Sequence, residues 1–182
     1  SMTVRGTGES VGVLSASSDV DLLMDGDMTV TSTGTGEAIG IVAEIGGEAR
    51  VTGLGSLSVS AADGDASGVK AEAGSNTSVE MSGDITVGTS NGYASGVMAV
   101  NNSSAVLVGA GTMDVYSGAG GNALGVVSVM GSSVSAEIVS MDVEAAGGNA
   151  FGVYAVSGAV SGDIGSMTVR GTGESVGVLS AS

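Results

Sequence analysis

Aliphatic and polar residues alternate in short runs along most of the chain, which is the period of half-buried β-strands. The most regular run is an aliphatic residue, one polar residue and then valine. It recurs at Met2–Val4, Met28–Val30, Leu57–Val59, Ile85–Val87, Met113–Val115, Met141–Val143 and Met167–Val169. A nearly constant spacing of about 28 residues between such runs indicates a structure built from stacked units.

Two further strands are predicted in each unit. A small residue, one variable residue, glycine and an aliphatic residue form the second strand, as at Ala38–Ile41. Its glycine follows the first strand at a nearly constant distance, as Gly40 follows Met28. A looser third strand, such as Val20–Met24, precedes each return to the first. Segments rich in Gly, Asn and Asp, such as Ala62–Asp65, separate the strands and favour turns.

Three strands and three turns close one coil of about 26–29 residues. A single coil cannot bury its own apolar face, whereas stacked coils pair each strand with its equivalents above and below. We therefore predict an all-β fold, a parallel β-solenoid of about six and a half coils with three short strands per coil. Residues 1–182 form one solenoid segment in this interpretation, and Val4 and Val30 lie in the same inward column.

The segment Ser1–Ser17 occurs again, letter for letter, as Ser166–Ser182. Six coils therefore make one block, residues 1–165, and residues 166–182 begin the next. This duplication fits either tandem blocks within a longer protein, of which we expect this sequence to be a part, or a copy of the first strand placed at the end as a cap.

Composition narrows the range of functions. The chain has 34 glycines, no proline, cysteine, tryptophan or histidine, and a net charge of -15. Its four basic residues cannot neutralise many phosphates, so nucleic acid is not an expected partner. No apolar run reaches the ~18 residues that a transmembrane helix needs. The absence of cysteine excludes disulfides and thiolate metal sites.

The inward phase of the second strand leaves a largely apolar set of residues pointing outward. Large apolar patches on soluble proteins mark contacts, so we predict a lateral contact surface for self-association. Its residues are Val11, Leu14, Ile39, Val42, Met98, Leu124, Val127, Phe151 and Tyr154.

Candidate chemistry is sparse, and we expect no enzyme activity and no catalytic residues. Carbohydrate-active β-helices need clustered carboxylates or aromatic platforms, and here the acid pairs Asp25 with Asp27 and Asp63 with Asp65 each flank a glycine in a predicted turn. Those turns offer hard oxygen ligands and give weak calcium candidates. They are Asp25, Asp27, Asp63 and Asp65. No other cofactor is expected.

The repeat pattern, as in GGNAFGVYAV at Gly147–Val156, resembles the β-solenoid repeats of bacterial cell-surface proteins, namely autotransporter passengers and filamentous haemagglutinin-like adhesins. The resemblance implies a right-handed β-helix in an extracellular or cell-surface location. The coil lengths break the hexapeptide period of the left-handed alternative. We expect a structural building block of a fibre or stalk, with an adhesin module that binds glycans or proteins as the alternative.

Overall fold

The computed structural model of the protein describes residues 1–182, which form strands and turns without any helix. None of its elements is therefore a helix that could cross a membrane. The strands are β1 (Met2–Gly6), β2 (Ser10–Ala16), β3 (Asp19–Ser32), β4 (Ala38–Glu44), β5 (Glu48–Ala61), β6 (Ala66–Glu72), β7 (Asn76–Met81), β8 (Ile85–Thr89), β9 (Ala94–Val100), β10 (Ser104–Ser117), β11 (Ala123–Val129), β12 (Ser133–Ala145), β13 (Ala150–Val156), β14 (Ala159–Gly171) and β15 (Ser175–Ala181).

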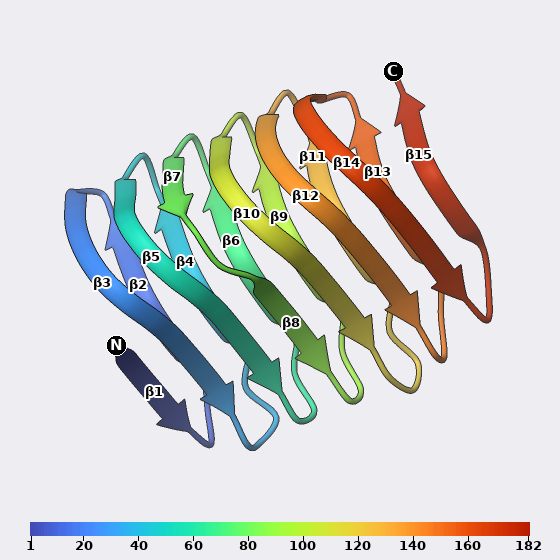
Figure 1. Cartoon of the computed structure of the whole chain (residues 1–182), viewed down its shortest axis with the longest axis horizontal. Helices are drawn as coiled ribbons and strands as arrows, with labels where there is room; N and C mark the ends of the chain where they lie inside the picture. Colours follow the sequence, from blue (N-terminus) through green and yellow to red (C-terminus); the bar gives the residue numbers. More distant parts are fainter.

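All strand pairs are parallel and lie in two sheets. Sheet A runs β1-β3-β5-β7-β10-β12-β14, with β8 paired to β5 and β10, and sheet B runs β2-β4-β6-β9-β11-β13-β15. Each coil adds one strand to sheet B and one to sheet A, except that one coil adds the two shorter strands β7 and β8 to sheet A. The coils lie side by side from the N-terminus to the C-terminus (Figure 1). We number them 1 to 7: coil 1 is β1 and β2, coil 2 is β3 and β4, and coil 7 is β14 and β15. The predicted parallel β-solenoid is confirmed.

Equivalent residues stack in register. Val4 pairs with Val30 and Val30 with Val59, and the same valine column continues through Val87, Val115 and Val143 to Val169. The first aliphatic residue of each aliphatic–polar–valine run is here called the anchor, and the strand that carries it the anchor strand. The anchor column, from Met2 to Met167, lies beside the valine column and is also continuous. These columns belong to a single core of 38 buried residues or pack against it at the ends. The sequence pattern therefore identified both the register and the inward face.

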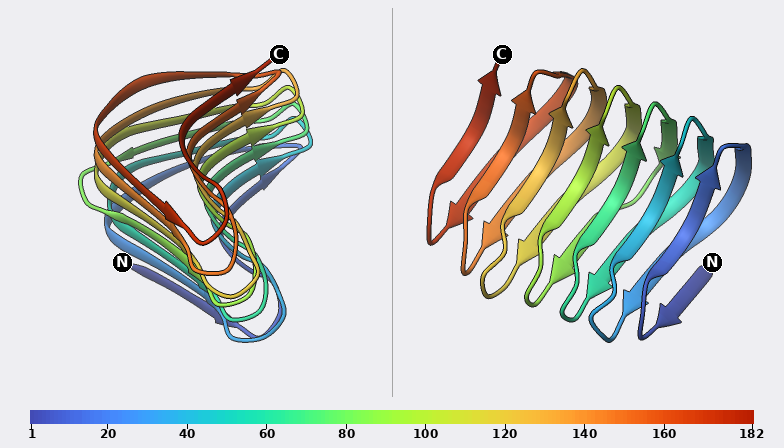
Figure 2. Two further views of the ribbon diagram at one scale, coloured as in Figure 1. Left: turned by 90° about the vertical axis from the view of Figure 1, so that its right-hand side faces the viewer. Right: turned by 180° about the vertical axis from the view of Figure 1, so that it is seen from behind.

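The third strand and the anchor strand run into one another as one long, bent strand in coils 2, 3, 5, 6 and 7. Only coil 4 keeps them apart, as β7 and β8. Glycine allows the bend in coils 2, 3, 5 and 7, where Gly26, Gly53, Gly109 and Gly162 have φ values of +132°, +71°, +82° and +121°, whereas β12 of coil 6 contains no glycine. L-residues with a Cβ rarely adopt these angles. A view along the stack shows the bend as a rounded corner where the prediction has a turn (Figure 2, left).

The repeated glycine of the second strand has a steric role. A Cβ atom at Gly68 would lie 2.6 Å from the carbonyl oxygen of Gly96 in the next coil, and the same clash recurs at Gly125 with Gly152. Any Cβ atom there would push neighbouring coils apart. In the last coil, Gly177 has no coil above it, and its nearest neighbour would be Met167 Sδ at 3.9 Å.

Candidate interaction surfaces

The predicted lateral contact residues lie together on the face of sheet B that points away from the core, which we call the outer face of sheet B. Two ladder columns build it. One is Val11, Ile39, Ser67, Ser95, Leu124 and Phe151; the other is Leu14, Val42, Lys70, Met98, Val127 and Tyr154. The hydrophobic core cluster includes Ile41 and Ala43 but not Val42, as expected for alternation across a strand. Ile39 also lies outside the cluster although it is two residues from Ile41, so the alternation does not continue across Gly40.

This face is packed more closely than an open apolar surface. Ile39, Val42, Val127 and Phe151 are 1%, 0%, 4% and 7% exposed, whereas Leu14 in coil 1 is 50% exposed. Val42 has Leu14 beneath it and Lys70 above it in the same column. Much of the apolar area expected from the sequence is therefore already covered by neighbouring coils. Whether the remainder forms a lateral contact stays a prediction.

A hollow of about 330 Å³ lies in the middle of the outer face of sheet B. It forms because Ser67 and Ser95 occupy positions where the neighbouring coils carry Ile39 and Leu124. Lys70 lines the hollow, and its ammonium lies 3.0 Å from Glu72 and 3.8 Å from Glu37. The single cation of this face is thus held by two carboxylates, one from its own coil and one from the coil below.

Burial and neighbouring charges together shift the pKa values of Glu37 and Lys70. Desolvation raises the pKa of Glu37, as do the charges of Asp65, Glu9 and Glu72, and the opposing effect of Lys70 is smaller. For Lys70, burial alone would lower the pKa, but the hydrogen bond to Glu72 and the nearby carboxylates outweigh it, and the pKa is raised. Lys70 therefore stays charged, and its charge is the one influence that lowers the pKa of Glu37.

The aromatic residues of this face contact each other. The rings of Phe151 and Tyr154 pack edge to face with centroids 5.3 Å apart, and Phe151 is buried. A sugar platform needs an exposed ring face, which Phe151 does not offer.

Two of the four carboxylates proposed for calcium, Asp27 and Asp65, accept backbone hydrogen bonds from the next coil. Asp25 and Asp27 lie within β3 beside the bend, not in the turn that the sequence predicted. Asp27 Oδ1 accepts from Ser56 N at 2.8 Å, and Asp65 Oδ1 accepts from Tyr93 N at 2.8 Å. Asp63 Oδ1 accepts from Asn91 Nδ2, while the Asp25 carboxylate makes no hydrogen bond. No three acidic side chains come together as metal ligands would.

This bridging role between coils was not predicted from the sequence. Asp84, Asn122 and Asn149 share it, each accepting a backbone N–H from the coil above. Aligning the coils places Asp27 and Asp84 directly before the first strand of the repeat, and Asp65, Asn122 and Asn149 directly before the second. That alignment is the signal by which they could have been found.

A carboxylate column lies on the outer face of the anchor strands. Asp114 and Asp142 are ladder partners in coils 5 and 6. Burial raises the pKa of Asp114, and the neighbouring charges of Asp142 and Asp84 raise it further. In coil 7, Arg170 covers this column: its Nη2 lies 2.6 Å from Asp142 Oδ2, and its Nε lies 3.8 Å from Glu144.

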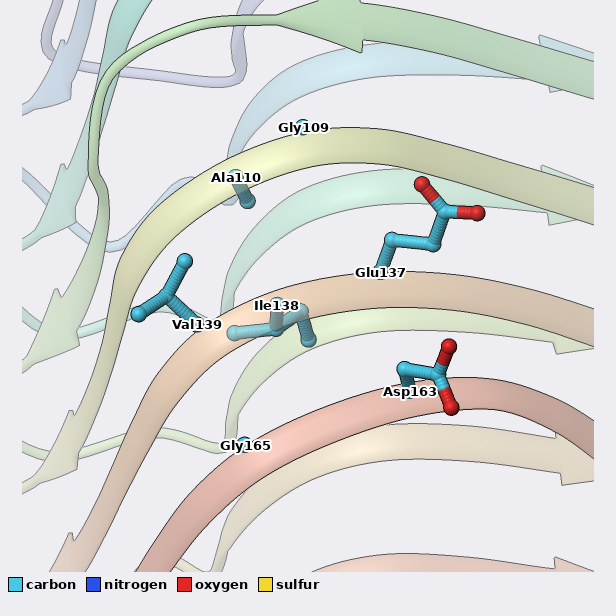
Figure 3. A pocket seen from close by; sticks show the side chains of 7 residues that line it. All are labelled: Gly109, Ala110, Glu137, Ile138, Val139, Asp163 and Gly165. Carbon is cyan, nitrogen blue, oxygen red and sulfur yellow. The ribbon is translucent and has the colours of Figure 1, made fainter.

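A second hollow, of about 460 Å³, lies at the bend of the long strands (Figure 3). Gly109, Ala110 and Gly165 give it its depth because they lack large side chains. Glu137 and Asp163 are ladder partners at its edge, and no cation lines it. We regard it as a consequence of the bend.

The two copies of the duplicated segment have the same secondary structure but different surroundings. β1 and β2 span residues 2–6 and 10–16, and adding 165 gives residues 167–171 of β14 and all of β15. Coil 2 stacks on the first copy, and the second copy stacks on coil 6. Arg170 pairs with coil 6, whereas Arg5, its counterpart, is exposed and makes no ion pair.

These features define a parallel β-solenoid protein. No protein-family description matches the chain, and no curated protein or solved structure is significantly similar to it.

Proposed function

We propose that the protein is a structural building block of an elongated extracellular or cell-surface fibre in which β-solenoid coils continue from block to block. The observation that supports this most directly is the duplicated segment, whose two copies have matching strand bounds. The chain therefore contains both neighbours of the repeated coil: coil 6, which lies below it, and coil 2, which lies above it. Apart from a new ladder between Asp19–Met24 and Ala159–Ile164, a block junction repeats contacts that this chain already makes.

The surfaces favour a scaffold role. The hollow on the outer face of sheet B holds a lysine that is already paired with two carboxylates, and the hollow at the bend has no cation. The net charge of -15 keeps rods apart from other acidic surfaces. Lateral association would use the remaining apolar part of the outer face of sheet B.

The test is the length of a two-block chain, residues 1–165 followed by residues 1–182. Six added coils at ~4.8 Å each should lengthen the particle by about 29 Å with no change in cross-section. Small-angle X-ray scattering measures both quantities, and the 182-residue chain is the matched control. Two blocks that scatter as separate bodies joined by a flexible connection would contradict the proposal.

A further inference from the structure

The hollow on the outer face of sheet B lies over β6 and β9, in the middle of that sheet (Figure 2, right). Ser67 and Ser95 form its floor, between the larger Ile39 and Leu124 of the same column. Its sides are the turn residues directly before the second strands and the residues at the far ends of β6 and β9. A volume of about 330 Å³ is enough for one small ligand.

The hollow carries more negative than positive charge. Glu37 and Asp65 line one side and Glu72 the other, and Lys70 is the one basic residue that lines it. The Glu37 carboxylate makes no hydrogen bond and lies 3.8 Å from the Lys70 ammonium, while Asp65 uses only Oδ1, which accepts from Tyr93 N. One ammonium balances only one of the three carboxylates, so the hollow favours a ligand with a cationic group that can donate hydrogen bonds.

A hydroxyl group on the floor has no acceptor for its proton. The Oγ atoms of Ser67 and Ser95 lie 3.1 Å apart and share one hydrogen bond, and neither makes another. Each hydroxyl carries one proton, so one of the two O–H groups lacks an acceptor within the protein. Both residues are buried, at 3% and 2% exposed, where an unused donor is costly. This donor indicates a ligand with an oxygen acceptor, independently of the carboxylates.

Tyr93 gives the hollow an aromatic side. It lines the hollow and is 53% exposed, so much of its ring is open to contact, in contrast to the buried Phe151. An exposed aromatic ring packs against the C–H groups of a sugar ring and also attracts an ammonium group. Met98 and Leu124 add apolar area beside it.

We propose that the hollow binds a hexosamine, a sugar ring that carries a free ammonium group. The ammonium lies between Glu37 and Asp65, which hold equivalent positions in adjacent coils, and a sugar oxygen accepts from the serine pair. The C–H face of the ring packs against Tyr93. A neutral sugar leaves the carboxylates unbalanced, and a simple amine leaves the serine donor unused. The inference goes beyond the proposed function and does not depend on it.

Nuclear magnetic resonance of the whole ¹⁵N-labelled chain tests the proposal, with glucosamine, N-acetylglucosamine, glucose and methylammonium as separate probes. Glucosamine should shift the amide signals of β6 and β9, and it should bind about tenfold or more tighter than each other probe because it alone combines the ring and the charge. A free amino sugar and a unit of a partly deacetylated polysaccharide present the same chemistry. A glucosamine trimer distinguishes them: tighter binding than the monomer indicates the polysaccharide, and equal or weaker binding the free sugar.

Single variants identify the groups that bind. Asp65→Asn removes a charge but keeps the oxygen that accepts from Tyr93 N, so the affinity for glucosamine should fall about tenfold without loss of the fold. Tyr93→Ala should weaken binding by a similar factor, whereas Tyr93→Phe keeps the ring and should bind like wild type. Glu137→Gln removes a carboxylate from the hollow at the bend and is the matched control, with no expected change.

A double variant fills the hollow. Ser67→Ile with Ser95→Leu introduces the side chains that coils 2 and 5 carry in the same column, so it should fold and should abolish binding. Circular dichroism checks the fold, and the Tyr93 variants, which change an exposed turn residue, test the site if the double variant does not fold.

Three results would overturn the proposal: glucosamine that binds no tighter than methylammonium or glucose, binding that persists in the folded double variant, or no shift of the β6 and β9 amides at tens of millimolar glucosamine. None of these titrations bears on the length of the two-block chain, which tests the proposed function separately.

Discussion

Arg170 in coil 7 donates a hydrogen bond to Asp142 in coil 6, with 2.6 Å between Nη2 and Oδ2. This is the one place where a basic side chain covers the carboxylate column of the anchor strands. The contact links the duplicated segment to the coil below it and neutralises charge that Asp114 and Asp142 otherwise share.

Arg170→Gln tests how much this ion pair stabilises the last coil. The side chain is 55% exposed, so the expected loss in the free energy of unfolding is only about 0.2–1 kcal/mol, decreasing with added salt. Hydrogen exchange of β15 amides should accelerate more than that of β9. Arg5→Gln is the matched control and should change neither, because Arg5 makes no ion pair. Equal effects of the two substitutions would contradict the assignment.

Gly68→Ala tests the close approach of neighbouring coils. The new Cβ would lie 2.6 Å from a backbone oxygen, which cannot move without shifting coil 4, so we expect a loss of about 1–3 kcal/mol. Gly177→Ala introduces the same methyl group at the uncovered end and should cost far less. Chemical denaturation followed by circular dichroism gives both values. A Gly68→Ala variant as stable as Gly177→Ala would exclude the steric role.

Ile45→Asn should stabilise the protein. Ile45 has a φ of +53° in the turn after β4, a conformation that costs a β-branched residue about 1–2 kcal/mol. It is 65% exposed, so little packing is lost. Asn101 has a φ of +58° at the equivalent turn, which shows that asparagine suits the position. A gain of about 1 kcal/mol in thermal or chemical unfolding is expected. Ile45→Val, which keeps the branched side chain, should bring no such gain.

Asp114→Asn should stabilise the protein at neutral pH by about 0.2–1 kcal/mol, because it removes a like charge stacked on Asp142. The pKa of Asp114 is raised in the folded state, so its ionised form opposes folding. That penalty is absent below the ordinary pKa of 3.8 and appears as the pH rises through the folded-state pKa. The difference between variant and wild type should therefore vanish in acid. Asp25→Asn removes the same charge away from the column and should show a smaller effect; a constant difference across pH would contradict the explanation.

Lys70→Met tests the charged group on the outer face of sheet B. It leaves Glu37 desolvated without its cation, so we expect a loss of about 1–3 kcal/mol at pH 7 that shrinks as Glu37 becomes protonated in acid. Adding Glu37→Gln should recover most of the loss. The double variant also makes this face more apolar, and ultracentrifugation should then detect lateral association if the predicted contact surface is real. A double variant that stays as dispersed as wild type would count against that surface.

Much of the fold was predictable because each coil repeats the same inward residues. Met28 and Val30 recur in kind along the whole ladder, and that recurrence determined both register and phase. The bend was not predictable, since a glycine such as Gly53 fits a turn and a bent strand equally well. The packing of Val42 was also missed, because alternation shows that a side chain points outward and not how closely Leu14 and Lys70 cover it.

The parallel ladder also sets which changes in length the molecule can absorb. Because Ile85 lies over Leu57 and Met113 over Ile85, removing residues 85–112 would bring Met113 directly over Leu57. Loss or gain of whole coils thus preserves every column, while other insertions must loop out at a turn or shift side chains to the wrong face. The length of such a rod therefore changes in steps of one coil, and recombination between equivalent positions of two coils is a route by which such steps can arise in evolution.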